Sequence, residues 1–368
     1  MWEVSYDNGE TWTSLNVQAQ EQTPDFIFEE YEDGYQLIRY EGNAASVTVP
    51  STYEGKPVRA IAAYAFAFNI NMRELIIPNS VTRMGESICL ACTRLEKVTL
   101  PFLGVTADDP RTFSTLIGNG ISPLSLTITG GTSICTEALA GCTVLENITL
   151  PFVGTTTATG TENSSFRSLF GVDNDSVPKS LKAVTITGGT SIGDSVFSGC
   201  AEIESIAIPF GVTSIGQSAF SGCSSLQSIT IPDSVTSIGM DAFTGSGAIQ
   251  IENGVSYVDK WVVRFDRSVT SVSFRSDTVG FAFAAFAGCP FQSIVIPSGV
   301  TIINSWAFGY CGTLESITIP SSVTSIGSSV FTGCSNVTIN VEASAKPDGW
   351  DVNWNPENYP INWGYTPA

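Results

Sequence analysis

Residues 226–243 read Leu226-Gln-Ser-Ile229-Thr-Ile231-Pro232-Asp-Ser-Val235-Thr-Ser-Ile238-Gly239-Met-Asp-Ala242-Phe243. Apolar and polar residues alternate in the first part, which predicts a short β-strand, and Pro232 marks the turn after it. Closely related stretches run from Ile203 to Phe220 and from Leu314 to Phe331. Recurrence at a fixed period of roughly 20 to 50 residues is typical of a repeat protein.

Twelve units share this pattern when each is indexed by the residue that follows its strand. The residues one and three places before the index are apolar in every unit. One coil of about 22–23 residues cannot bury its apolar side alone, so the repeat predicts stacked coils and a parallel sheet along a solenoid. The index residues are Pro50, Pro78, Pro101, Thr129, Pro151, Thr187, Pro209, Pro232, Arg275, Pro297, Pro320 and Asn340.

Two phrases of the unit point to a family. They are Ser-Val-Thr-Ser-Ile-Gly at 234–239 and Ala-Phe-x-Gly-Cys at 219–223. With them, roughly residues 44 to 341 resemble the BspA-type leucine-rich repeat family. The resemblance implies a leucine-rich repeat solenoid of about 11–12 coils, with a curved parallel β-sheet on the concave face and short strands and turns on the convex side. It also implies a bacterial surface protein that acts in adhesion.

The chain is expected to have three parts. Residues 1–43 form an acidic N-terminal β-hairpin and capping region, residues 44–341 form the solenoid, and residues 342–368 form an aromatic C-terminal cap. Longer spacings place insertions near 102–122, 152–180 and 249–268, and Asn253-Gly254 predicts a hairpin in the last one. Residues 5–12 resemble the Asp-box pattern Ser-x-Asp-x-Gly-x-Thr-Trp, which predicts a structural hairpin turn.

Composition excludes several classes of function. The net charge is −19, from 16 basic and 35 acidic residues, so nucleic acid and anionic membrane surfaces are repelled. No histidine is present, which excludes histidine-dependent triads and metal sites. We therefore expect no enzyme activity, no cofactor and no metal. No apolar run is long enough for a membrane-spanning helix. No signal peptide is visible at Met1, so a secreted or cell-surface location implies that one was removed.

The nine cysteines follow the repeat rather than a pairing scheme. Cys200 and Cys223 lie 23 residues apart, as do Cys311 and Cys334. This spacing predicts an inward column in which cysteine acts as a small buried apolar residue. Cys89-x-x-Cys92 is similar to a redox or zinc half-motif, but Cys89 stands at the phenylalanine position of its coil, which favours burial.

Strand positions two and four places before the index should face outward, onto the concave side. They form a threonine column beside a serine column, which suits either a solvated sheet surface or a hydroxyl platform for a ligand. The candidate ligand-binding residues are Thr99, Thr127, Thr149, Thr185, Thr230, Ser205, Ser228 and Thr318.

Three functions remain open. The first is non-enzymatic recognition of an extracellular protein or glycan through the concave face and the loops at 102–122 and 152–180. The second is a carbohydrate-binding module that uses Trp350, Trp354 and Trp363, although these residues can equally seal the last coil. The third is a spacer whose surface binds nothing.

Overall fold

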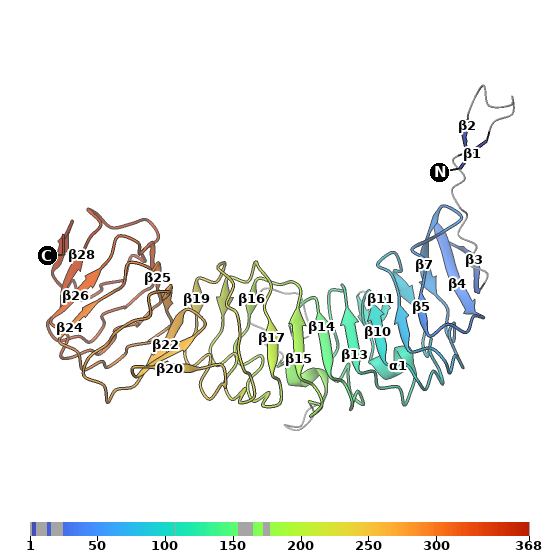
Figure 1. Ribbon diagram of the computed structural model, residues 1–368, viewed down its shortest axis with the longest axis horizontal. Coiled ribbons are helices and arrows are strands. Elements are labelled where there is room, and N and C mark those ends of the chain that lie inside the picture. Colours follow the sequence, from blue (N-terminus) through green and yellow to red (C-terminus); the bar gives the residue numbers. More distant parts are fainter. Residues whose placement is uncertain are drawn as a thin grey trace. The chain divides into compact units, whose positions relative to one another are not determined.

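The computed structural model describes residues 2–4, 13–15, 25–106, 108–153, 165–171 and 177–367. The chain divides into two compact units, Met1–Ile121 and Ser122–Ala368. Figure 1 labels many of the strands and the helix α1. At the N-terminus, β1 (Trp2–Val4) and β2 (Thr13–Leu15) pair antiparallel, as the predicted hairpin requires. The Asp-box turn at 5–12 lies outside the described residues.

The N-terminal unit combines a hairpin with the first coils. Strands β3 (Phe26–Tyr31) and β4 (Gly34–Tyr40) pair antiparallel, and β4 then pairs in parallel with β7 (Lys56–Ile61). β7 also pairs with β6 (Thr52–Tyr53) and β9 (Arg83–Met84). The outward-facing strands β5 (Ser46–Thr48), β8 (Glu74–Ile76) and β10 (Lys97–Leu100) are parallel.

The insertion near 102–122 carries β11 (Gly104–Thr106), β12 (Asp109–Pro110) and the short helix α1 (Phe113–Ile117). The Thr112 hydroxyl caps α1 by accepting a hydrogen bond from the Thr115 amide at 3.2 Å. Carbonyl groups of α1 accept hydrogen bonds from the amides of residues 87–89, so the helix takes the place of a coil.

The C-terminal unit holds two runs of parallel strands, one early and one late. The first run is β13 (Ser125–Ile128), β14 (Asn147–Leu150), β15 (Ala183–Ile186) and β17 (Ser205–Ala207). The second is β24 (Ser293–Val295), β26 (Ser316–Ile319), β28 (Thr338–Val341) and β29 (Ile361–Trp363). A 3-10 helix, η1 (Phe166–Leu169), lies in the 152–180 insertion, of which 154–164 and 172–176 are outside the described residues.

Two-residue strands close each coil on its second side. They pair in parallel as β16 (Ser191–Ile192), β18 (Ser214–Ile215) and β19 (Ser237–Ile238), and again as β23 (Gly280–Phe281), β25 (Ile302–Ile303) and β27 (Ser325–Ile326). These are the short strands expected from the second apolar pair of the repeat.

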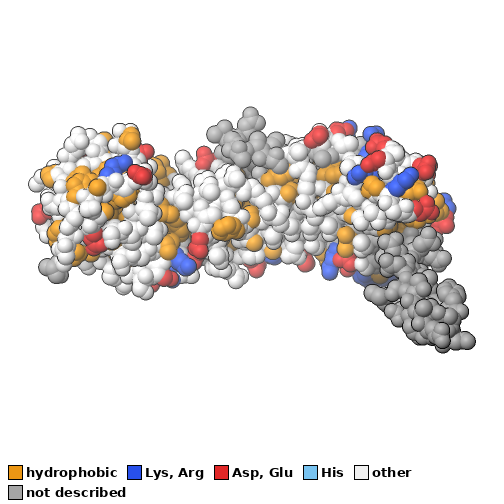
Figure 2. Space-filling model, turned by 90° about the horizontal axis from the view of Figure 1, so that it is seen from above, with side chains coloured by type: hydrophobic (Ala, Val, Ile, Leu, Met, Phe, Trp, Pro, Cys, Tyr) orange, Lys and Arg blue, Asp and Glu red, His pale blue; other side chains and the backbone are white. Residues whose placement is uncertain are grey.

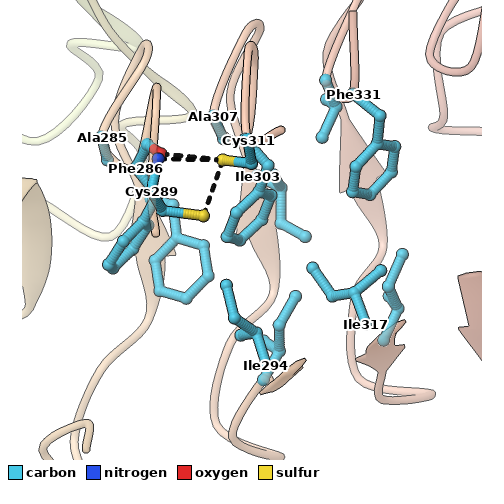
Figure 3. Packing of buried hydrophobic residues seen from close by; sticks show 14 of the residues in the cluster. Ala285, Phe286, Cys289, Ile294, Ile303, Ala307, Cys311, Ile317 and Phe331 are labelled. Atoms are coloured by element: carbon cyan, nitrogen blue, oxygen red, sulfur yellow. Dashed lines mark hydrogen bonds between the residues drawn. The ribbon is translucent and has the colours of Figure 1, made fainter. Parts of the chain in front are cut away.

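The core is a set of columns in which each coil contributes the same side chain. Phe197, Phe220 and Phe243 stack at centroid distances of 5.5 and 5.1 Å. Phe286, Phe308 and Phe331 repeat the arrangement at 5.5 and 5.9 Å, and Figure 3 shows the neighbouring isoleucine and cysteine columns. Each column extends the apolar interior from one coil to the next, so stability comes from contacts between neighbouring coils.

The 249–268 insertion is a three-stranded antiparallel meander. It consists of β20 (Gln250–Glu252), β21 (Val255–Val258) and β22 (Trp261–Phe265), with the predicted Asn253-Gly254 turn between the first two. β22 pairs in parallel with β23, so the ladder restarts from the meander rather than from β19. Where the ladder is interrupted, side chains accept hydrogen bonds from backbone amides in place of a neighbouring strand. Asp259 accepts from the Ile231 amide at 2.9 Å, and Asn304 accepts from the Ile238 amide at 2.8 Å.

Three details of the predicted repeat are wrong. No strand forms over 270–274: on the side of the preceding unit, the Asp259 carboxylate of the meander, rather than this segment, accepts from the Ile231 amide. Ser228 makes only a single bridge, to Ser205. In the last unit, Pro320 is aligned with Glu342 rather than Asn340, since Thr318 pairs with Asn340 and Ile319 with Val341.

Candidate functional site

The outward face of β13, β14, β15 and β17, here called the hydroxyl face, carries the predicted columns in register. Thr127, Thr149 and Thr185 are aligned across three strands. A second row runs Ser125, Asn147, Ala183, Ser205 and Ser228. Adjacent strands lie about 4.8 Å apart, so each row presents polar groups at that interval. Ala183 interrupts the second row, and Ala207, which is paired with Thr185, interrupts the threonine row.

The hydroxyl groups on this face are free to bind something else. Thr185 and Ser205 are exposed, and Thr127 and Thr149 are half-buried. Ser228 and Thr230 of the next unit are also exposed, and a bridge from Ser228 to Ser205 connects that unit to the face. Within the part of the chain that the structure describes, none of these six hydroxyls bonds to another residue. An exposed hydroxyl keeps both a donor and two acceptor sites for water or a ligand.

Charge is confined to the border of the hydroxyl face. At the strand starts, Lys182 forms ion pairs with Glu202 at 3.8 Å and Glu204 at 3.4 Å. Figure 2 shows one side of the molecule, on which the charged side chains of the C-terminal unit are few and scattered. The face can therefore accept a neutral polar partner without the desolvation of a full charge.

The corresponding strands of the N-terminal unit offer a different surface. Thr99 is half-buried and lies beside Ile76. The Ser46 hydroxyl donates to the Glu74 carboxylate at 2.6 Å, and Lys97 stands in register with Glu74. These polar groups bond within the chain or carry charge, so Thr99 belongs to a less regular surface than the hydroxyl face.

The last sheet does not present the predicted site residue. Thr318 is only 7% exposed, because Val295 and Asn340 flank it in register. Nearby polar groups bond to one another: Asn340 donates to Ser316 at 3.2 Å, and Asn362 donates to Asn340 at 2.9 Å. Thr318 is therefore corrected from a ligand contact to a buried sheet residue.

The tryptophans are divided between core and surface. Trp350 and Trp354 are 2% and 4% exposed, whereas Trp363 is 36% exposed. The Trp350 indole donates to the Val323 carbonyl at 3.0 Å, and Trp354 packs on Phe331 at 6.0 Å between centroids. Two of the three rings thus cover the last repeats and present no face to a sugar.

The comparison with known sequences decides the family. The sequence model described as "BspA type Leucine rich repeat region" matches six copies, over residues 40–161, 190–281 and 280–347. This chain belongs to the BspA-type leucine-rich repeat family. Members of this family are known as bacterial surface proteins, and the family and its fold are generally non-catalytic. No curated protein matches the chain.

Solved structures that resemble this family member come from bacterial leucine-rich repeat proteins. A leucine-rich cell surface protein of Faecalibacterium prausnitzii is 23% identical, with a TM-score of 0.25, and the match covers 87% of this chain and 94% of that one. A protein of Bacteroides ovatus is 19% identical, with a TM-score of 0.25 and coverage of 86% and 93%. The T. pallidum protein TpLRR is 18% identical, with a TM-score of 0.20 and coverage of 85% and 88%.

The cysteines of this BspA-type chain are buried in its core, apart from the half-buried Cys135. Burial raises the pKa of Cys142, Cys200 and Cys223 to about 12, so these thiols are neutral at physiological pH. Figure 3 shows Cys311 donating to the Phe286 carbonyl at 3.1 Å, with the Cys289 thiol 2.6 Å away. Cys89 is fully buried, and burial raises its pKa, as its place at a phenylalanine position predicts.

The described residues contain neither a metal-binding cluster nor a membrane-spanning helix. No group of three or more His, Cys, Asp or Glu side chains among them could hold a metal ion. No helix among them is both long and apolar enough to cross a membrane.

The repeat pattern in the sequence did not predict the side chains that hydrogen-bond to the backbone where the ladder is interrupted. Asn304 stands where other units of this BspA-type repeat have glycine after isoleucine, as in Ile238-Gly239 and Ile326-Gly327. That departure was the available signal, since a polar side chain at an inward turn position must find a partner when buried.

Proposed function

We propose that this chain recognises an extracellular protein or glycan, as a secreted or cell-surface adhesion protein, through the hydroxyl face of β13, β14, β15 and β17. The observation that carries the proposal is the row of unpaired hydroxyls in register across neighbouring strands. The insertions near 102–122 and 152–180 are proposed to add contacts at the edges.

Two properties of the hydroxyl face support this proposal: its hydroxyls are regularly spaced, and it carries no charge. An uncharged polar surface loses less hydration free energy when covered than a charged one, and a repeating donor–acceptor array can match an extended chain of peptide or sugar groups. In the last sheet, by contrast, Asn340 donates to Ser316 and Asn362 donates to Asn340, so part of its polar row is already hydrogen-bonded within the chain.

The carbohydrate-module hypothesis has less support, because Trp350 and Trp354 are buried. Only Trp363 keeps a partly exposed ring, and a single ring is a small stacking platform.

The test is a parallel screen of the purified chain against host extracellular proteins and a glycan array. The variant changes Thr149, Thr185 and Thr230 to Lys. The control changes three exposed threonines that directly precede β18, β25 and β27 to Lys: Thr213, Thr301 and Thr324. A saturable ligand lost only in the first variant supports the proposal. A ligand retained by both variants, or the absence of any ligand, overturns it.

A further inference from the structure

The meander and the turn after β23 line an open surface pocket outside the hydroxyl face. Its volume is about 460 Å³, which lies in the range of small-ligand sites. Three strands supply one wall, and residues 284–287 supply the other, mostly as alanines. We name it the meander pocket.

Strand register explains why three different side chains line the same wall. Ile251 is paired with Ser256, and Ser256 with Arg264, so all three project from one face of the meander. Tyr257 and Val262 point to the other face and are fully buried in the core. An apolar, a hydroxyl and a cationic group therefore stand in a line, with about 4.8 Å between neighbouring strands.

Two guanidinium groups in this pocket have no acidic partner. Over the described ranges, Arg264 makes no hydrogen bond or ion pair, and Arg267 only donates to the Ala287 carbonyl, at 3.1 Å. The nearby Arg275, outside the pocket, approaches Glu252 at 3.8 Å and Asp277 at 3.6 Å.

The one carboxylate in the lining is already engaged. Asp266 accepts a hydrogen bond from the Ser268 amide at 2.9 Å, and this bond lowers the pKa of the carboxyl group. Two cations and one anion leave the lining with a net positive charge, in a chain whose net charge is −19. The pocket thus attracts an anion locally although the protein as a whole repels one.

The geometry points to a binding site for a carboxylate-bearing sugar residue of an acidic glycan. Guanidinium groups bind carboxylates with two parallel hydrogen bonds. One acidic pyranose carries its carboxylate and its hydroxyls within a few ångströms, which matches Arg264 beside Ser256. The Ile251 side chain, 73% exposed, and the alanine methyl groups offer aliphatic contact to the ring C–H groups. In an acidic peptide, the carboxylate and a hydroxyl come from separate residues, which fits this spacing less well.

The test measures binding of a tetragalacturonate, a sialylated oligosaccharide, their neutral counterparts and an oligo-glutamate peptide by calorimetry. Arg264→Gln should weaken binding of an acidic oligosaccharide about tenfold to a hundredfold, the loss expected for one charge-assisted contact. Arg83→Gln is the control, because Arg83 is exposed and the change in net charge is the same. Unchanged thermal unfolding of Arg264→Gln shows that the fold is kept.

Each outcome of this test either supports or overturns the proposed site. Binding of either acidic oligosaccharide that falls with Arg264→Gln, persists with Arg83→Gln and weakens with added salt supports the site. Equal binding of neutral sugars, binding of the peptide alone, an equal effect of both variants, or no binding at all overturns it. The lysine variant of the hydroxyl face should bind the acidic sugar normally, so failure here and failure of the proposed adhesion surface are separate results.

Discussion

Replacing Asn304 by Leu tests whether this side chain stabilises the solenoid where its parallel ladder is interrupted after β19. The Asn304 amide accepts from the Ile238 amide at 2.8 Å and donates to the Thr236 carbonyl at 2.9 Å. Asn304 is only 8% exposed. Its side chain therefore replaces the backbone of a missing neighbouring strand beside β19. Leucine has a similar size but leaves both backbone groups without this partner.

The expected cost follows from the burial of those two groups. An unsatisfied buried donor or acceptor costs about 1–3 kcal/mol. The Ile238 amide is buried and should incur most of that cost, whereas the Thr236 carbonyl lies closer to solvent and should incur about 1 kcal/mol. We expect Asn304→Leu to lower the free energy of unfolding by about 2–4 kcal/mol in total.

The assay is urea unfolding followed by circular dichroism, together with hydrogen exchange of the peptide that contains Ile238. Asn336→Leu is the control, because Asn336 is exposed, and its effect should stay within about 0.5 kcal/mol. If Asn304→Leu and Asn336→Leu unfold at the same urea concentration and the Ile238 amide keeps its protection, the assigned role of Asn304 is refuted.

Three further predictions concern the core. Phe220→Ala should cost about 3–5 kcal/mol of unfolding free energy in urea titrations, since the ring is fully buried between two others, whereas Phe210→Ala at an 85% exposed site should change little. Trp350→Phe should lose about 1–3 kcal/mol because the Val323 carbonyl loses its donor, and equal thermal unfolding to wild type would contradict this. Burial raises the pKa of three thiols to about 12: Cys142, Cys200 and Cys223. These thiols should therefore resist iodoacetamide at pH 8 until urea is added. Labelling detected by mass spectrometry before urea is added would contradict their burial.

The regular part of the fold could be predicted because each coil repeats the same physical solution. The apolar residues one and three places before the index are inward in strand after strand, as with Val184 and Ile186. The phenylalanine and cysteine columns followed from the same period. An alternating pattern fixes which side of a strand is buried, and the repeat length fixes which residues become neighbours.

The irregular part depends on contacts that no period reveals. The Asn253-Gly254 turn could be predicted from the sequence, but the pairing of β22 with β23 and the absence of a strand over 270–274 could not. Similarly, the outward position of Thr318 was correct by alternation, yet its neighbours bury it. Alternation predicts direction, whereas exposure depends on the size of neighbouring side chains across the sheet.

The two candidate sites differ in the same way: the hydroxyl face follows the repeat, and the meander pocket does not. The hydroxyl columns were visible in the sequence, because they repeat with the strands. The meander pocket was not, since Ile251, Ser256 and Arg264 meet only through the register of one insertion.

Site-specific photo-crosslinking tests the central claim, that the hydroxyl face contacts the ligand, most directly. A photoreactive phenylalanine derivative is placed at Thr185 in one protein and at Thr213 in another, both exposed positions in the C-terminal unit. Each protein is irradiated on host cells and on isolated extracellular matrix. The account predicts a discrete crosslinked product from position 185 and none from position 213. A product from position 213 alone, or none from position 185 while the unmodified chain binds, would contradict it.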